Sequence, residues 1–313
     1  MFKGIKLHAV FAPRMRVVWM LMGLLLLVGL LRSVSVAQCL ADTKDSSHYV
    51  GQIIYSNDGY LEVFDFQTHE TSQHRIGRVM ADPVWSPIQQ NMVAFGWRTL
   101  YLLDIETNEA TQLIRHGGDP SWSPTGDALV YKYSENPRGL HILELANRET
   151  RYIPVQDARS DVYPIQPTWS PDGHLIAFTN DDGDGNYNIF TIDTECREST
   201  QPQCIPRQLT ESTGSSTSPS WSPNGDQIVF ESDRDGTWAI YVMNRDGNEV
   251  QKLTDNPEGD FEPTFSPDGT HIAFRRDNGN PGPTGANIYV MRTDGTDIQC
   301  ITSRGGVEPD WHD

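Results

Sequence analysis

One short motif, Pro-x-Trp-Ser-Pro or a close variant of it, recurs along the chain and constrains its fold more than any other feature. Each copy is anchored by one aromatic residue, and the six anchors are Trp85, Trp122, Trp169, Trp221, Phe265 and Trp311. Successive anchors lie 37, 47, 52, 44 and 46 residues apart. A period of about 40 to 50 residues is typical of repeat architectures, in which each repeat is one supersecondary unit.

Each anchor except the last is followed by a turn and three short strand-like runs. In the copy at Trp169, the turn at 171–173 precedes runs at 175–178, 188–193 and 207–210. Ser-Pro-Asp-Gly suits a type I turn, because proline fixes φ at the second position and glycine relieves strain at the fourth. Each repeat therefore predicts a four-stranded antiparallel meander of about 45 residues, the size of a propeller blade.

Proline placement predicts how each blade is oriented. Proline cannot donate a hydrogen bond to a neighbouring strand, so the Pro-x-Trp strand belongs at a sheet edge. We assign it as the innermost strand, beside a central channel. Because side chains alternate between the two faces of a strand, the proline and the aromatic residue share one face. We therefore expect the aromatic anchors to pack between neighbouring blades.

The two ends of the chain complement each other. Residues 51–76 contain three strand-like runs with no Pro-x-Trp motif before them. The C-terminus has Pro309-Asp310-Trp311 with no strands after it. Together they make one complete blade, which adds to the five internal ones. We predict an all-β, six-bladed propeller over residues 50–313, closed by pairing of the N- and C-terminal strands.

The repeat resembles that of the TolB-like β-propellers, which are related in architecture to WD-repeat propellers. The resemblance rests on Trp-Ser-Pro-Asp-Gly-x-x-Ile-Ala-Phe, then Ile-Tyr-Val-Met and Asp-Gly, in several copies over roughly residues 50–313. It implies an exported six-bladed propeller that works through protein–protein contact.

The N-terminus has the pattern of a secretory signal peptide. Basic residues precede an apolar stretch at 17–31, and Ser35-Val36-Ala37 offers small residues at a cleavage site. We predict a signal peptide over 1–37, a linker over 38–49, and a periplasmic or secreted protein. A signal segment that is not cleaved would be its only membrane attachment, and that alternative stays open.

Four cysteines remain after residue 37. Cys196 and Cys204 lie in one polar loop, and in an oxidising compartment we predict that they form a disulfide. Cys39 and Cys300 could pair or stay free. No cysteine or histidine set has zinc spacing.

The charge is strongly acidic, with 42 Asp and Glu against 24 Lys and Arg and a formal net charge of −18. A nucleic-acid-binding protein normally carries a basic patch, so the balance argues against that class. The excess acid could serve solubility alone, or it could attract a basic partner or a cation. We expect a monomer whose partner is a protein or peptide.

No catalytic motif is present: neither a Gly-x-Ser-x-Gly elbow, nor a glycine-rich phosphate loop, nor His-Glu-x-x-His. Asn180, Asp182 and Asp184 are spaced like the first ligands of a calcium loop, with Gly185 in sixth place. Thr191 stands where such a loop has glutamate, and a plain hairpin explains the segment as well. We therefore expect no catalytic residue and no cofactor, with calcium as the minor alternative.

One further set of residues comes from the repeat itself. The residues that precede the prolines of the inner strands should form a ring at one mouth of the channel, and they are Asp82, Asp119, Gln166, Ser218, Glu262 and Glu308. Four of them are carboxylates, which would favour a cation or a basic side chain. The alternative is that these polar residues only make local hydrogen bonds.

These observations favour an exported, non-catalytic protein-binding scaffold whose channel mouth takes a partner segment. The rival reading is a metal-assisted lyase or hydrolase, acting on a glycan or peptide at the same mouth with carboxylates that hold the metal.

Overall fold

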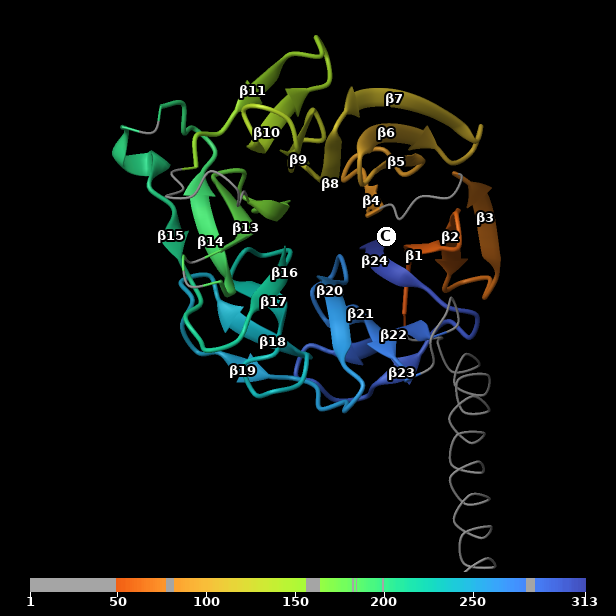
Figure 1. Ribbon diagram of the computed structural model, residues 1–313. Coiled ribbons are helices and arrows are strands. Elements are labelled where there is room, and N and C mark those ends of the chain that lie inside the picture. The colour runs from red at the N-terminus through yellow and green to blue at the C-terminus, as the bar shows by residue number, and fades with distance from the viewer. Residues whose placement is uncertain are drawn as a thin grey trace, which may run out of the picture.

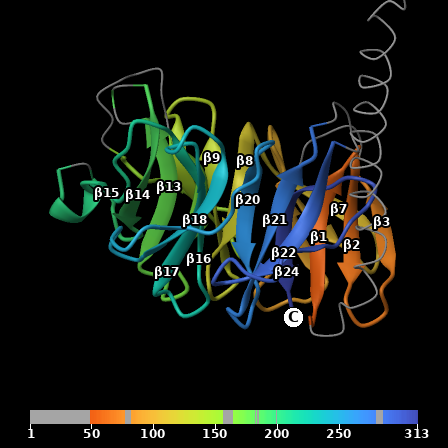
Figure 2. The same cartoon turned by 90° about the horizontal axis from the view of Figure 1, so that it is seen from below.

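The computed structural model describes residues 49–76, 82–155, 164–181, 183, 185–198, 200–279 and 285–313. Within these ranges the chain forms six four-stranded antiparallel sheets, arranged as blades around a central axis (Figure 1). The inner strands run along that axis (Figure 2). The six-bladed all-β propeller predicted from the repeat is therefore confirmed.

The predicted signal peptide and nearly all of the predicted linker lie outside the described residues. None of the helical segments that the structure describes has the length and apolar character needed to cross a membrane.

We number the blades by their inner strands in chain order. Blade 1 contains β4 (Val84–Trp85), β5 (Met92–Phe95), β6 (Thr99–Asp104) and β7 (Glu109–Arg115). Blade 2 contains β8 (Gly117–Trp122), β9 (Ala128–Tyr133), β10 (Gly139–Glu144) and β11 (Thr150–Tyr152). Blade 3 contains β12 (Ile165–Trp169), β13 (Leu175–Asp181), β14 (Tyr187–Asp193) and β15 (Arg207–Gln208).

Blade 4 contains β16 (Ser216–Trp221), β17 (Gln227–Ser232), β18 (Ala239–Asn244) and β19 (Gln251–Lys252). Blade 5 contains β20 (Asp260–Phe265), β21 (His271–Asp277), β22 (Ala286–Arg292) and β23 (Gln299–Cys300). Blade 6 is composite, with inner strand β24 (Val307–His312) from the C-terminus and β1 (Gln52–Asn57), β2 (Tyr60–Asp65) and β3 (Thr71–Arg75) from the N-terminal side.

Blade 6 closes the ring as predicted. Strand β24 pairs antiparallel with β1, and Trp311 lies opposite Ile53 while Asp310 lies opposite Ile54. The two strands lie side by side next to blade 1 (Figure 1). Sheet edges that would otherwise stay open at the chain ends are therefore paired.

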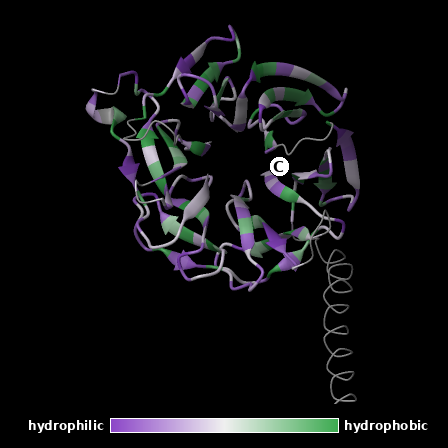
Figure 3. Cartoon of the chain, viewed as in Figure 1, coloured by the Kyte–Doolittle hydropathy of each residue, from purple (hydrophilic) through white to green (hydrophobic). Residues whose placement is uncertain are grey.

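The second and third strands of the blades carry the core, and the outermost strands face water. Strand β1 is buried at its four central positions, whereas four of the five residues of β3 are exposed. Figure 3 shows the same gradient, with hydrophilic colour on the outer strands and hydrophobic colour further in. This arrangement leaves the inner strands, with their prolines, to form the wall of the channel.

The aromatic anchors pack between neighbouring blades. Trp85 of blade 1 belongs to a buried cluster with Ile54 and Leu61 of blade 6. Trp221 of blade 4 packs likewise with Ile189 of blade 3. Five of the six anchors are buried, and Trp169 is half-buried against the cluster formed by blades 2 and 3. Large aromatic side chains stabilise such interfaces through the apolar area that they remove from water.

The predicted disulfide between Cys196 and Cys204 is present, with the two Cα atoms 4.9 Å apart. It joins the two arms of the loop between β14 and β15, where residues 202–204 form a short 3₁₀ helix, η2. Both cysteines are fully buried in a cluster with Ile153 and Val155 of blade 2. Cys39 lies outside the described residues. Cys300 is disulfide-bonded and is not a free thiol.

Candidate functional site

The inner strands of all six blades enclose a channel of about 580 Å³. All six residues predicted to form the mouth ring line it, together with the prolines that follow them. Because they hold the same position in equivalent strands, they lie at the same end of the channel. We call this ring the acidic mouth, and its members are Asp82, Asp119, Gln166, Ser218, Glu262 and Glu308.

The backbone at the mouth has an unusual conformation that the repeat imposes. The register of inner-strand pairing shifts at this position in five blades. Five mouth residues have φ between 49° and 55°, namely Asp119, Gln166, Ser218, Glu262 and Glu308. Non-glycine residues seldom adopt this left-handed conformation, and each such residue costs about 1–3 kcal/mol. The surrounding contacts must therefore hold it in place.

Those contacts are hydrogen bonds that pass from blade to blade. The N–H of Gln166 donates to Oδ2 of Asp119 at 3.1 Å, and the N–H of Ser218 donates to Oε1 of Gln166 at 3.2 Å. The N–H of Glu308 donates to Oε2 of Glu262 at 2.6 Å. Mouth side chains thus bond to the backbone of the next blade, as expected if these residues make local hydrogen bonds. The docking role of the ring stays a prediction.

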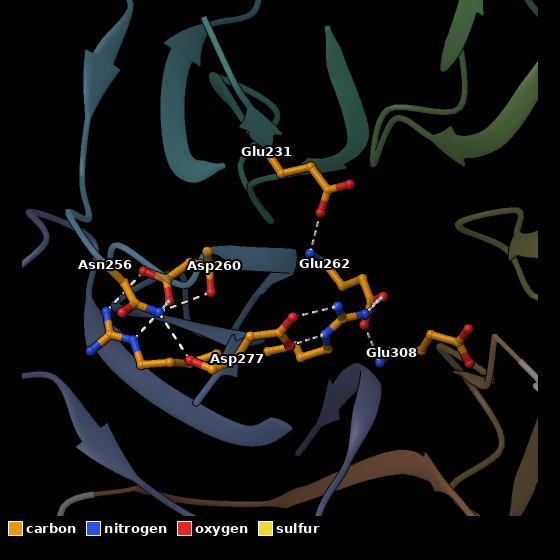
Figure 4. A network of polar contacts seen from close by, with 9 residues as sticks. Glu231, Asn256, Asp260, Glu262, Asp277 and Glu308 are labelled. Carbon is orange, nitrogen blue, oxygen red and sulfur yellow. Dashed lines mark hydrogen bonds and ion pairs between the residues drawn. The ribbon is translucent and has the colours of Figure 1, made fainter. Parts of the chain in front are cut away.

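Where a mouth side chain is too short to reach the next blade, a residue of the second strand accepts the inter-blade hydrogen bond instead. The Ser218 side chain is shorter than the others, and Oε2 of Glu231 in β17 accepts the N–H of Glu262 at 2.6 Å (Figure 4). The hydroxyls of Thr217 and Ser218 donate to the other oxygen, Oε1, at 2.6 and 3.1 Å. Burial, and then the charge of Glu262, raise the pKa of Glu231. Sequence reasoning missed this residue.

Two basic side chains are paired with mouth carboxylates. Nζ of Lys132 lies 2.8 Å from Oδ1 of Asp119. Nη1 of Arg275 lies 2.7 Å from Oε1 of Glu262, the mouth residue labelled in Figure 4. Within the described residues, the mouth and Glu231 together hold five carboxyl groups against these two cations. The mouth therefore keeps more carboxyl groups than cations after its own ion pairs are made.

The crowding of carboxyl groups affects the pKa of Asp82. Burial, and then the charges of Glu308 and Asp119, raise the pKa of Asp82 well above its usual value, while Lys132 opposes them. A positive charge that entered the mouth would lower that pKa and stabilise the ionised form. The mouth therefore has the electrostatic character to bind a cationic group.

The candidate calcium loop is only partly described. Asn180 is a buried residue of β13, while Asp182 and Asp184 lie outside the described residues. In blade 4 the corresponding connection is a tight turn, in which the N–H of Gly236 donates to the carbonyl of Asp233 at 2.8 Å. No group of three or more His, Cys, Asp and Glu is placed to hold a metal ion in the part of the chain that the structure describes.

Comparison with known proteins places the chain in a family. The sequence profile of the TolB beta propeller domain matches residues 120–254 and 203–312, which together cover more than half of the chain. The chain belongs to the TolB β-propeller family. In this TolB propeller the mouth conformation recurs in blades 2 to 6, each time at the residue before the proline of the repeated motif.

Among known proteins, the chain is 33% identical over 110 residues to "Uncharacterized peptidase YuxL" of Bacillus subtilis, which is 35% of this chain and 16% of that protein. It is 29% identical over 152 residues to "Protein TolB homolog" of Chlorobium luteolum, 47% of this chain and 32% of that protein. The chain thus spans a third or less of each. The crystal structure of TolB from Acinetobacter baumannii superposes with a TM-score of 0.68 at 21% identity, over 83% of this chain and 66% of that one. At that identity the likeness shows the fold alone.

Proposed function

We propose that this TolB propeller is an exported, non-catalytic binding scaffold, and that its acidic mouth takes a basic segment of a partner protein. The observation that carries the proposal is the number of carboxyl groups at the mouth. Even after Lys132 and Arg275 have paired with Asp119 and Glu262, carboxyl groups remain in excess around the channel opening. A fixed patch of one sign attracts and orients a partner segment of the opposite sign.

The channel wall suits the rest of a lysine or arginine side chain. Below the carboxyl groups, six prolines line the channel: Pro83, Pro120, Pro167, Pro219, Pro263 and Pro309. Long basic side chains can lay their aliphatic stems along apolar surface while the charged end finds a carboxylate. A cavity of about 580 Å³ has room for more than one such side chain.

Removal of the mouth charges tests the proposal. Purified protein is screened against random short peptides, and the enriched peptides should contain lysine or arginine in excess. In the variant Asp82→Asn, Asp119→Asn, Glu262→Gln and Glu308→Gln, the Kd of the tightest peptide should rise about tenfold or more. The amide side chains keep an oxygen that can accept the inter-blade hydrogen bonds, as Gln166 already does.

A matched control removes charge from the opposite end of the propeller. Asp172 and Asp268 lie in the turns after the inner strands of blades 3 and 5, and blade 4 has Asn224 at the same place. The variant Asp172→Asn with Asp268→Asn should bind the peptide as tightly as the unaltered chain. Equal affinity of the mouth variant, or a screen without basic enrichment, would contradict the proposal.

Metal analysis of the same preparation addresses the enzymatic alternative. A scaffold of this kind needs no transition metal, whereas a metal-assisted lyase or hydrolase would carry one in stoichiometric amount. Export is supported by the basic, apolar and small-residue pattern over 1–37, and it would place the acidic mouth in the periplasm or outside the cell.

A further inference from the structure

The exposed large apolar side chains divide between the two ends of the propeller. Among the described residues they are Val50, Ile88, Trp97, Tyr187, Ile205, Val250 and Ile298. The five aliphatic ones lie at the end opposite the acidic mouth, in the turn after an inner strand or just before a second or an outer strand. The two aromatic ones lie at the mouth end, where the third strands of blades 1 and 3 begin. Within the described residues, exposed tryptophan and tyrosine side chains therefore occur only on the face that carries the mouth.

Trp97 is the more exposed of these two aromatic residues. Of the seven tryptophans that the structure describes it alone is exposed, with 47% of its surface open to water, whereas Tyr187 has 38%. Blade 4 also has a tryptophan just before its third strand, but Trp238 is half-buried and its ring packs on that of Phe261 with centroids 5.9 Å apart. A covered indole removes a large apolar area from water, so an exposed one offers a partner more binding energy than a smaller side chain would.

The loop that carries Trp97 is bonded to blade 2 beside the mouth. It contains only residues 96–98, between β5 and β6. The carbonyl of Gly96 accepts the N–H of Asp119, a mouth residue, at 3.1 Å. The carbonyl of Arg98 accepts the N–H of His116 at 2.7 Å. Trp97 lies between these two contacts, one residue away from the hydrogen bond to Asp119.

Two glycines allow this loop to pack closely on blade 2. A side chain at Gly118 would collide with the carbonyl oxygen of Trp97. Gly96 has a φ of 150°, and a side chain there would collide with the carbonyl oxygen of Thr99. The backbone of Trp97 therefore lies directly on β8, the strand that contains Asp119. A loop held at several points loses little freedom when a partner covers it, which favours binding.

Arg98 determines which kind of side chain suits Trp97. Its guanidinium carbon lies 4.8 Å from the centroid of the Trp97 ring. This cation gives the surface beside the ring a positive charge. A second basic side chain would be repelled there, whereas an apolar side chain would not. Trp97 therefore suits an apolar residue of the partner, while the carboxyl groups of the mouth suit its basic residue.

We propose that Trp97 is an aromatic anchor, which packs against an apolar residue of the partner segment whose basic residue enters the acidic mouth. The anchor rests on the function proposed above and adds a sequence requirement to it. Because the loop is bonded to Asp119, the distance from Trp97 to the mouth is about 10 Å, which roughly three residues of an extended segment span. The partner should therefore carry an apolar residue within about three positions of its lysine or arginine.

The peptides selected for binding to the propeller test the anchor. Besides lysine or arginine, they should be enriched in Trp, Tyr, Phe or Leu within about three positions of the basic residue. Trp97→Ala should raise the Kd of the tightest peptide at least about tenfold. Ile88→Ala removes an exposed apolar side chain at the opposite end of the propeller, and as the matched control it should leave the Kd unchanged. Both variants should keep the thermal stability of the unaltered chain, because both side chains are exposed.

A double-mutant cycle then shows whether Trp97 contacts the apolar residue of the peptide. Replacing that residue by alanine should weaken binding to the unaltered chain at least about tenfold. The same replacement should weaken binding to the Trp97→Ala variant less than about threefold, because the contact is already lost. An equal loss against both proteins would overturn the anchor.

The mouth variant separates failure of the anchor from failure of the proposed function. Weaker binding to the mouth variant, with a Kd that Trp97→Ala leaves unchanged, would overturn the anchor alone. Selected peptides that are basic but not enriched in apolar residues would do the same. A Kd that the mouth variant leaves unchanged would contradict the proposed function and the anchor together.

Discussion

At the scale of single residues, the left-handed conformation at the mouth connects stability to charge. A φ near 50° costs energy, and mouth side chains of neighbouring blades offset that cost by accepting the backbone N–H groups of Gln166, Ser218 and Glu308. Asp119 and Glu262 are consequently held by the ring on one oxygen and by a basic side chain on the other. The same carboxylates that give the mouth its charge also join the blades.

Glu231 provides the sharpest test of this residue-scale claim. Glu231→Ala leaves the N–H of Glu262 and two hydroxyls without their acceptor in a buried place. We expect the free energy of unfolding to fall by about 3 kcal/mol, because unsatisfied buried donors keep their full desolvation cost. Denaturant unfolding measures it, with Glu211→Ala, an exposed glutamate, as the control that should change it by less than about 0.5 kcal/mol. Similar stability of both variants would contradict the claim that Glu231 joins the blades as a hydrogen-bond acceptor.

The sequence allowed the mouth ring to be predicted but not its surroundings. The six ring positions follow from adjacency to a repeated proline, which is a local feature. Glu231, Lys132 and Arg275 lie on second strands, and their closeness to the mouth depends on strand pairing across a bulge. No pattern within those strands marks the pairing, so only the structure brings the three side chains to the site.

At the scale of elements, turn and strand chemistry placed the blades well, and the departures lie where a repeat is altered. The Ser-Pro-Asp-Gly turns and the apolar runs predicted the second and third strands. The two-residue strand β4 was not anticipated, since the motif around Trp85 matches the others in sequence. The loop between β14 and β15 is longer than the loops between the third and fourth strands of the other blades, and it contains the Cys196–Cys204 disulfide.

The disulfide in this loop should contribute to the stability of the propeller. Cys196→Ser with Cys204→Ser should lower the free energy of unfolding by about 2–3 kcal/mol, because the unfolded chain gains the entropy of an open loop. Denaturant unfolding at neutral pH under oxidising conditions measures the change. Glu195→Ala with Arg197→Ala removes only an exposed ion pair of the same loop and should cost less than about 1 kcal/mol. A double serine variant of unchanged stability would show that burial alone holds the loop.

At the scale of the whole molecule, the ring is closed because strands from the N-terminal and C-terminal parts of the chain pair in one blade. Pairing of β24 with β1 sets all six inner strands around one axis, and only then do six separate polar residues become one acidic mouth. Sequence reasoning reached this arrangement because the ends are complementary halves of one repeat. The function proposed for the mouth is a property of the closed ring, and no single blade has it.

The most direct test of that account is to find where a basic peptide lies on the propeller. The peptide selected by the screen is made with a photoreactive group beside its lysine or arginine, crosslinked to the unaltered protein, and mapped by mass spectrometry. The account predicts attachment within the inner strands at the mouth, at or next to Asp82, Asp119, Glu262 and Glu308. Attachment confined to the outer strands or to the turns around Asp172 and Asp268 would contradict it.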